Sequence, residues 1–150
     1  MFRRLLVAYD GSSHAKRALA EAVDLASAND GSVTVMAVAP DPSVWGLDFG
    51  YNASVDFAEV AEQMQREYRT VLDAAVATVP DGVPVSQVLR HGAAGREIVD
   101  EADTSEYDLI VMGSRGRGEL RSLLLGSVSH RVLQGSRVSV LVVQVEHEPA

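Results

Sequence analysis

Short apolar runs alternate with helical patterns along this chain, and that alternation limits its fold more than any other feature. Runs of four to eight residues rich in valine, leucine, isoleucine or alanine predict buried strands. The predicted strands are residues 4–9, 32–39, 83–89, 109–112 and 138–143. Apolar residues at helical spacing predict helices over residues 13–28, 55–78, 96–102 and 127–134. Strands separated by helices form βαβ units, so we predict a parallel sheet covered by helices on both faces.

One domain of this kind accounts for residues 1–150, because the chain shows no repeat, low-complexity tract or linker. Its apolar runs are far shorter than the ~20 residues of a membrane span. Its first residues lack the long apolar stretch of a signal peptide. We therefore expect a cytoplasmic protein with no membrane partner. Without cysteine, the chain has no disulfide, thiolate metal site or thiol nucleophile.

The charge of the chain is unevenly distributed. The formal net charge is −8, which weighs against non-specific binding to nucleic acid. The stretch from Gly113 to Arg137 contains five arginines and a single acid, Glu119, so it carries a charge of +4. The arginines of this basic stretch are Arg115, Arg117, Arg121, Arg131 and Arg137. Two interpretations remain open, a local anion site or a solvated surface segment. The acidic run from Asp100 to Glu106 is most simply a solvated helix end.

The segment after the fourth predicted strand carries the features of a phosphate site. Ligands of open α/β sheets bind outside the carboxyl ends of strands, and this segment leaves such an end. Its glycines let backbone N–H groups converge on an anion. Gly126 and Ser127 then begin a helix, whose free N–H groups and positive dipole end favour phosphate. The hydroxyls of Ser127 and Ser129 are further donors. The alternative is a glycine-rich turn followed by an ordinary serine cap.

Two common nucleotide motifs are absent from the sequence. No GxxxxGK motif occurs, and the single lysine, Lys16, lies on the first predicted helix. No GxGxxG motif occurs either, because Arg121 stands where the third glycine would follow Gly116 and Gly118. The sequence therefore favours neither a P-loop NTPase nor a dinucleotide-binding dehydrogenase.

The glycine spacing instead resembles the universal stress protein family. Gly113, Gly116 and Gly126-Ser127 match that family's motif, G-x2-G-x9-G-S/T, at every position. The opening strand with its Asp10-Gly11-Ser12 turn is similar too, and the resemblance covers essentially the whole chain. It implies a three-layer α/β/α sandwich, related to the adenine nucleotide alpha hydrolase-like fold, with a five-stranded parallel sheet in order 3-2-1-4-5. Ser139 departs from the pattern, since many relatives have proline there.

The resemblance also implies a ligand and a set of contacts. The ligand would be ATP, and any Mg²⁺ or Mn²⁺ would be held by its phosphates. Asp10 would lie near the adenosine, although it also suits a turn residue that caps the first helix. The backbone of Val38 would contact adenine, although from its pattern alone Val38 is a core strand residue. The groups around the ribose and phosphates would be Gly113, Gly116, Gly126, Ser127 and Ser129, with Arg115 as a neighbour.

Three functions fit this sequence to different degrees. The first is an ATP-binding regulator of the stress response. The second is a slow ATPase or phosphotransferase. No general base and no acidic pair for two metals is evident, so we name no catalytic or metal-binding residue and expect at most weak ATP hydrolysis. The third, a receiver domain, needs an aspartate ending the third strand, where the chain instead has Arg90-His91-Gly92.

The fifth predicted strand, Val138 to Val143, predicts a homodimer. The implied strand order places it at a sheet edge, and it contains neither charge nor proline to discourage pairing. Two copies of this strand would pair antiparallel about a two-fold axis, as the resemblance also implies. The alternative is that the tail, Gln144 to Ala150, covers the edge.

Overall fold

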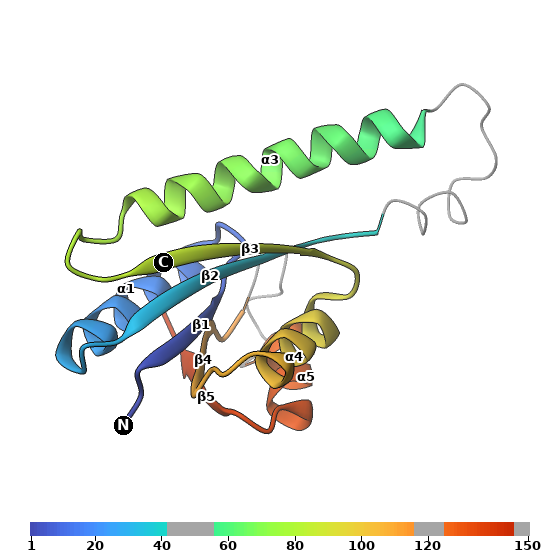
Figure 1. Cartoon of the computed structure of the whole chain (residues 1–150). Helices are drawn as coiled ribbons and strands as arrows, with labels where there is room; N and C mark the ends of the chain where they lie inside the picture. Colours follow the sequence, from blue (N-terminus) through green and yellow to red (C-terminus); the bar gives the residue numbers. More distant parts are fainter. Residues whose placement is uncertain (42–55, 116–124, 146–150) are drawn as a thin grey trace, which may run out of the picture.

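A computed structural model describes residues 1–41, 56–115 and 125–145 of the chain. It contains a five-stranded parallel sheet in the order β3-β2-β1-β4-β5, which confirms the predicted topology. The strands are β1 (Arg4–Ala8), β2 (Ser32–Ala39), β3 (Val85–His91), β4 (Leu109–Gly113) and β5 (Ser139–Val143). The helices are α1 (Ser13–Ala28), α3 (Phe57–Ala77), α4 (Ala94–Thr104) and α5 (Ser127–Gly135) (Figure 1). None of them is long and apolar enough to cross a membrane in the part of the chain that is described.

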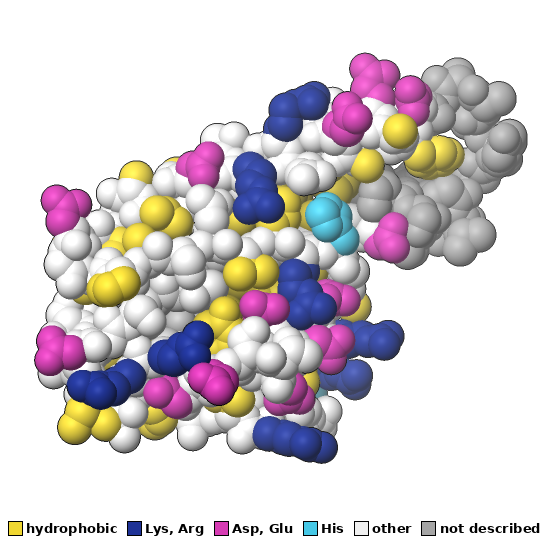
Figure 2. Space-filling view, in the orientation of Figure 1, with side chains coloured by type: hydrophobic (Ala, Val, Ile, Leu, Met, Phe, Trp, Pro, Cys, Tyr) yellow, Lys and Arg dark blue, Asp and Glu magenta, His cyan; other side chains and the backbone are white. Residues whose placement is uncertain are grey.

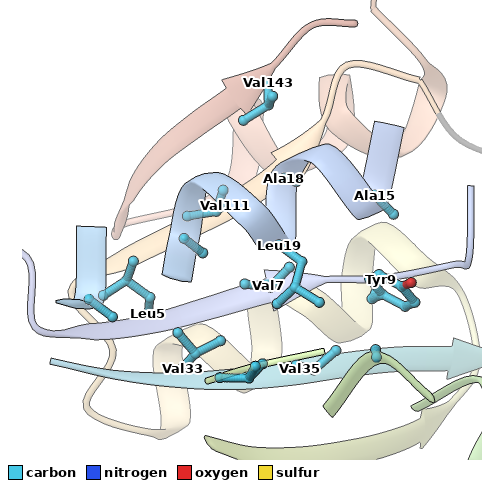
Figure 3. Packing of buried hydrophobic residues seen from close by; sticks show 14 of the residues in the cluster. Leu5, Val7, Tyr9, Ala15, Ala18, Leu19, Val33, Val35, Val111 and Val143 are labelled. Atoms are coloured by element: carbon cyan, nitrogen blue, oxygen red, sulfur yellow. The ribbon is translucent and has the colours of Figure 1, made fainter. Parts of the chain in front are cut away.

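Two hydrophobic cores lie on opposite faces of the sheet. Leu5 and Val7 of β1 pack into the core under α1 and α3, part of which is shown in Figure 3. Leu6, between them in sequence, packs into the second core with Ile98 of α4 and Val132 of α5. Successive side chains of a strand point to opposite faces, so a strand between two helical layers is apolar at every position. This explains the unbroken apolar run at the start of the chain.

The strand order reverses between β1 and β4. From β1 the chain proceeds through β2 to β3 on one side, whereas β4 and β5 lie on the other. β1 and β4 are direct neighbours, with Val7 opposite Val111. The connections that leave their carboxyl ends run to opposite sides, which opens a crevice there.

The third strand begins and ends two residues later than predicted. The prediction included Pro84, but the strand runs over Val85–His91. The Pro84 carbonyl accepts a hydrogen bond from the Val33 N–H at 2.9 Å, just outside the strand, where the missing proline N–H costs nothing. At the other end, Arg90 and His91 continue the pairing opposite Val38 and Ala39.

Candidate functional site

A pocket of about 220 Å³ lies at the carboxyl ends of the central strands. Strand ends supply Asp10 after β1, Val38 on β2, and Gly113 and Arg115 at the end of β4. Both helical layers contribute walls as well, with Tyr68 from α3 and residues of α4 and α5. The pocket therefore occupies the switch point where the strand order reverses, as the sequence predicted for a ligand site.

Apolar side chains form much of the pocket wall. They include Met36, Val38, Ile98, Met112 and Val128. The polar residues are fewer and include Asp10 and Arg115. Apolar walls with a few placed polar groups are the usual composition of a small-molecule site. Among the described residues, no group of three or more histidines or acids is placed to hold a metal ion.

Asp10 is positioned by the turn that joins β1 to α1. Its Oδ1 accepts a hydrogen bond from the Ser12 N–H at 2.9 Å, and Gly11 adopts a φ of +82° that disfavours side chains. The cap of α1 is Ser12, whose Oγ accepts from the Ala15 N–H at 3.1 Å. Asp10 thus holds the turn and lines the pocket, and Ser12 caps the helix.

The N-terminus of α5 opens into the same pocket. Gly126 is its N-cap, with φ −72° and ψ 166°, and it has no side chain to bond to the first-turn N–H groups. Gly126 and Val128 line the pocket, and Ser127 is the first residue of the helix. The first N–H groups of a helix have no intrahelical partner and form its positive dipole end. This arrangement can bind an anion at the pocket wall.

Ser129 has a structural bond that the sequence did not indicate. Its side chain is 2% exposed, and its hydroxyl donates to the Ser114 carbonyl at 2.8 Å. The Gly126 N–H donates to the same carbonyl at 2.6 Å. A hydroxyl has one hydrogen, so in this geometry Ser129 does not also donate to a ligand. The two bonds fasten the start of α5 to the turn after β4.

Gly113 also has a packing role beside its place in the pocket wall. A Cβ atom there would lie 2.6 Å from the His14 Cβ and 3.0 Å from the His14 carbonyl carbon. Glycine is therefore needed for α1 to pack against the end of β4. The remaining predicted contact, Gly116, lies outside the described residues.

Several pocket residues were not predicted from the sequence. They are Tyr9, Met36, Tyr68, Ala94 and Ile98. Tyr68 and Ile98 lie on the apolar faces of α3 and α4, which sequence patterns identify only as core. Burial, and secondarily the charge of Asp10, raises the pKa of Tyr9.

Comparison with known proteins places this geometry in a family. Residues 1–144 match the model of the universal stress protein family. The chain is 38% identical over 146 residues to a universal stress protein of Thermus aquaticus, covering 96% of this chain and 100% of the relative. It is 33% identical over 150 residues to universal stress protein YxiE of Bacillus subtilis, with the same coverage.

Solved structures share the fold. The structure of hypothetical protein MJ0577 matches with a TM-score of 0.84 and 25% identity, covering 99% of each chain. A universal stress protein from Archaeoglobus fulgidus in complex with dAMP matches with a TM-score of 0.65 and 22% identity, over 95% of this chain and 97% of that one. A universal stress protein in complex with cAMP matches with a TM-score of 0.60 and 24% identity, over the same shares. From its sequence and its fold, this chain belongs to the universal stress protein family.

Proposed function

We propose that this protein is a cytoplasmic regulator of the stress response that binds ATP between β1 and β4. One observation carries the proposal: the uncapped N-terminus of α5 opens into a pocket with apolar walls at the switch point of the sheet. That combination suits a ligand with a flat apolar base and a phosphate chain. The complexes of two relatives with dAMP and cAMP support an adenine nucleotide.

The residues present fit each part of ATP. Phosphates would accept hydrogen bonds from the first-turn N–H groups of α5 and from the Ser127 hydroxyl, with Arg115 adding attraction. Adenine would lie among Met36, Val38 and Ile98, which are apolar pocket residues from both sides of the strand ends. The Asp10 carboxylate would accept from a ribose hydroxyl. Any Mg²⁺ or Mn²⁺ would be held by the phosphates.

We infer binding rather than efficient turnover. Asp10 is the single carboxylate on the described pocket wall, and its Oδ1 is engaged with the Ser12 N–H. Phosphoryl transfer with two metals needs carboxylate ligands, and attack by water needs a group to orient it. The alternative is a slow ATPase or phosphotransferase. Steady release of phosphate over many turnovers by purified protein would favour that alternative.

The nucleotide retained by the purified protein tests the proposal directly. We expect mass spectrometry of the released ligand to identify ATP or another adenine nucleotide. Calorimetry on nucleotide-free protein should then show one ATP site per chain and much weaker binding of GTP. Protein that retains no nucleotide and produces no binding heat with ATP would contradict the proposal.

Asp10→Ala is expected to weaken ATP binding by about 1–2 kcal/mol, because a charge-assisted hydrogen bond to the ribose is lost. That loss corresponds to a rise in Kd of about five- to thirty-fold. Calorimetry on both proteins measures it. Asp10→Asn is the matched control, because its amide oxygen can still accept from the Ser12 N–H while the charge is removed. We expect Asp10→Asn to keep the turn and to lose part of the affinity. If Asp10→Ala and the unsubstituted protein bind ATP with equal affinity, Asp10 stabilises the turn and does not contact the nucleotide.

We also propose that the protein is a homodimer through β5. This strand lies at the edge of the sheet, and Leu141 is 37% exposed on it. Val140, by contrast, packs against the core beneath α4 and α5, so Leu141 is more suitable than Val140 for an interface substitution. The alternative is that the tail, residues 144–150, covers this edge. Residues 146–150 of that tail lie outside the described residues.

Leu141→Lys is expected to shift a dimer to a monomer, because the two-fold axis would bring two ammonium groups together in an apolar contact. Light scattering at micromolar protein measures the mass. Phe57→Lys on α3 is the control, since Phe57 is similarly exposed, at 38%, and lies away from this edge. A monomeric unsubstituted protein, or a dimer that Leu141→Lys leaves intact, would reject the β5 interface.

A further inference from the structure

A groove of about 380 Å³ separates α4 from α5 and shares no lining residue with the nucleotide pocket. The two helices approach closely because Gly95 lies beneath Arg131, where a Cβ atom would come within 2.6 Å of the arginine Cγ. A Cβ atom at Gly135 would lie 3.5 Å from Val99 Cγ2, which is an ordinary contact. The groove is lined by Arg96, Val99, Asp100, Arg131, Gln134 and Gly135.

Arg96 of α4 and Arg131 of α5 both line this groove, and acidic side chains neutralise little of their charge. Arg96 Nε lies 3.9 Å from Asp100 Oδ2, and their side chains are 74% and 48% exposed, so this pair is weak. The Arg131 guanidinium makes no hydrogen bond or ion pair within the ranges that the structure describes. Two arginines and one aspartate leave a formal charge of +1 in the groove. Arg131 is also a member of the basic stretch, and unlike Arg115 it does not line the nucleotide pocket.

We propose that the groove between α4 and α5 binds a carboxylate side chain of an acidic segment on a partner protein. A guanidinium presents a planar fork that matches a carboxylate with two parallel hydrogen bonds. The Gln134 amide offers a further donor, and Val99 offers an apolar contact beside it. Asp100 in the wall repels a doubly charged phosphate more strongly than a single carboxylate.

The exposure of the groove favours a protein segment over a small free acid. Small-molecule sites enclose most of their ligand, whereas Arg96 is 74% exposed. A carboxylate bound at such an exposed surface needs further contacts around it to be held. The residues on either side of it in a polypeptide can make those contacts. Figure 2 shows basic and acidic side chains interspersed over the lower right of the molecule, where Figure 1 places α4 and α5. The cations that an acidic segment would meet in the groove are Arg96 and Arg131.

The test uses a short fluorescein-labelled peptide of alternating glutamate and alanine, without nucleotide. We expect saturable binding by anisotropy, and shifts of backbone amide NMR signals confined to α4 and the C-terminal half of α5, where Arg131, Gln134 and Gly135 line the groove. The double variant Arg96→Gln, Arg131→Gln should weaken binding about tenfold. Arg66→Gln, Arg69→Gln is the control, because it removes the same charge from exposed positions of α3. Asp100→Asn should tighten binding, which a merely structural role of Asp100 does not predict.

Four outcomes would overturn the proposal. They are an equal loss in the control double variant, equal binding of a glutamine-alanine peptide, signal shifts at the N-terminus of α5, and competition by inorganic phosphate as strong as by the unlabelled glutamate peptide. None of these measurements needs ATP. Failure of the groove is therefore distinguishable from failure of the proposed nucleotide site.

Discussion

Replacing Gly126 with aspartate is expected to abolish ATP binding and to leave the fold as stable as before, or slightly more stable. Gly126 is the N-cap of α5, and its φ of −72° and ψ of 166° are accessible to any residue. An aspartate there would accept hydrogen bonds from the first-turn N–H groups and interact favourably with the helix dipole. It would thereby occupy the donors proposed for phosphate and repel the phosphates by charge.

The expected loss is large because two effects coincide. Losing charge-assisted hydrogen bonds costs about 1.5–3 kcal/mol each. Two such bonds correspond to a rise in Kd of more than about a hundredfold. The N-cap gain over glycine is a few tenths of a kcal/mol. We therefore expect calorimetry to show a lower affinity for ATP, and thermal unfolding without ATP to show an equal or slightly higher stability.

Two further substitutions at Gly126 separate charge from shape. Gly126→Asn can cap the helix without a charge, so its affinity should lie between those of the parent and Gly126→Asp. Gly126→Ala neither caps nor repels and should retain most of the binding. If Gly126→Asp binds ATP as the parent does, the phosphates do not lie at α5. If Gly126→Ala loses as much affinity as Gly126→Asp, the site depends on the space at Gly126 rather than on the first-turn N–H groups of α5.

The topology was predictable because the strands of this sheet are buried on both faces. β1 and β4 consist of apolar runs bounded by turn residues, and β2 was predicted with its observed bounds. β3 was less accurately predicted because charged residues belong to it. Arg90 continues the strand, with its Nε 2.9 Å from Glu97 Oε2 and its Nη1 3.2 Å from Glu101 Oε2. The apolar pattern of a strand does not indicate an ion pair with the helix that follows it.

The same pairing changes the interpretation of the acidic run that follows Val99. Glu101 is 15% exposed, and it accepts hydrogen bonds from Arg90 and, at 3.3 Å, from the Tyr107 hydroxyl. It is thus part of the packing between α4 and the sheet rather than of a solvated helix end. The charge of the run could not distinguish a solvated glutamate from a partly buried one. Glu101 is partly buried because Arg90 and Tyr107, outside α4, supply its partners.

The candidate site was predictable where it depends on strand ends and on the start of α5. Asp10, Val38, Gly113 and Arg115 do converge on one pocket, because parallel strands bring their carboxyl ends to one edge. The walls supplied by α3 and α4 were not predictable, since Tyr68 and Ile98 differ from core residues only in tertiary position. The bond from Ser129 to Ser114 likewise becomes visible only once α5 is packed.

Gly113→Ala is expected to lower the free energy of unfolding by about 2–3 kcal/mol, the usual cost of forcing an extra group into a packed contact. The new Cβ would meet backbone as well as side chain, 3.0 Å from the His14 carbonyl carbon and 3.1 Å from its oxygen. A change of rotamer cannot relieve a backbone contact, so the first turn of α1 must move. That turn follows Asp10 and Ser12, so ATP affinity should fall together with stability. Chemical denaturation and calorimetry measure the two effects.

Gly82→Ala provides the matched control for Gly113→Ala, because a Cβ atom at Gly82 would find no atom within 4 Å. Its stability should stay within about 0.5 kcal/mol of the parent. The comparison removes the general effect of glycine on the unfolded chain, which the two substitutions share. A stable Gly113→Ala protein that no longer binds ATP would show that this glycine serves the ligand alone. A large loss of stability in Gly113→Ala without one in Gly82→Ala would instead assign the first glycine of the family motif to the packing of α1 on β4.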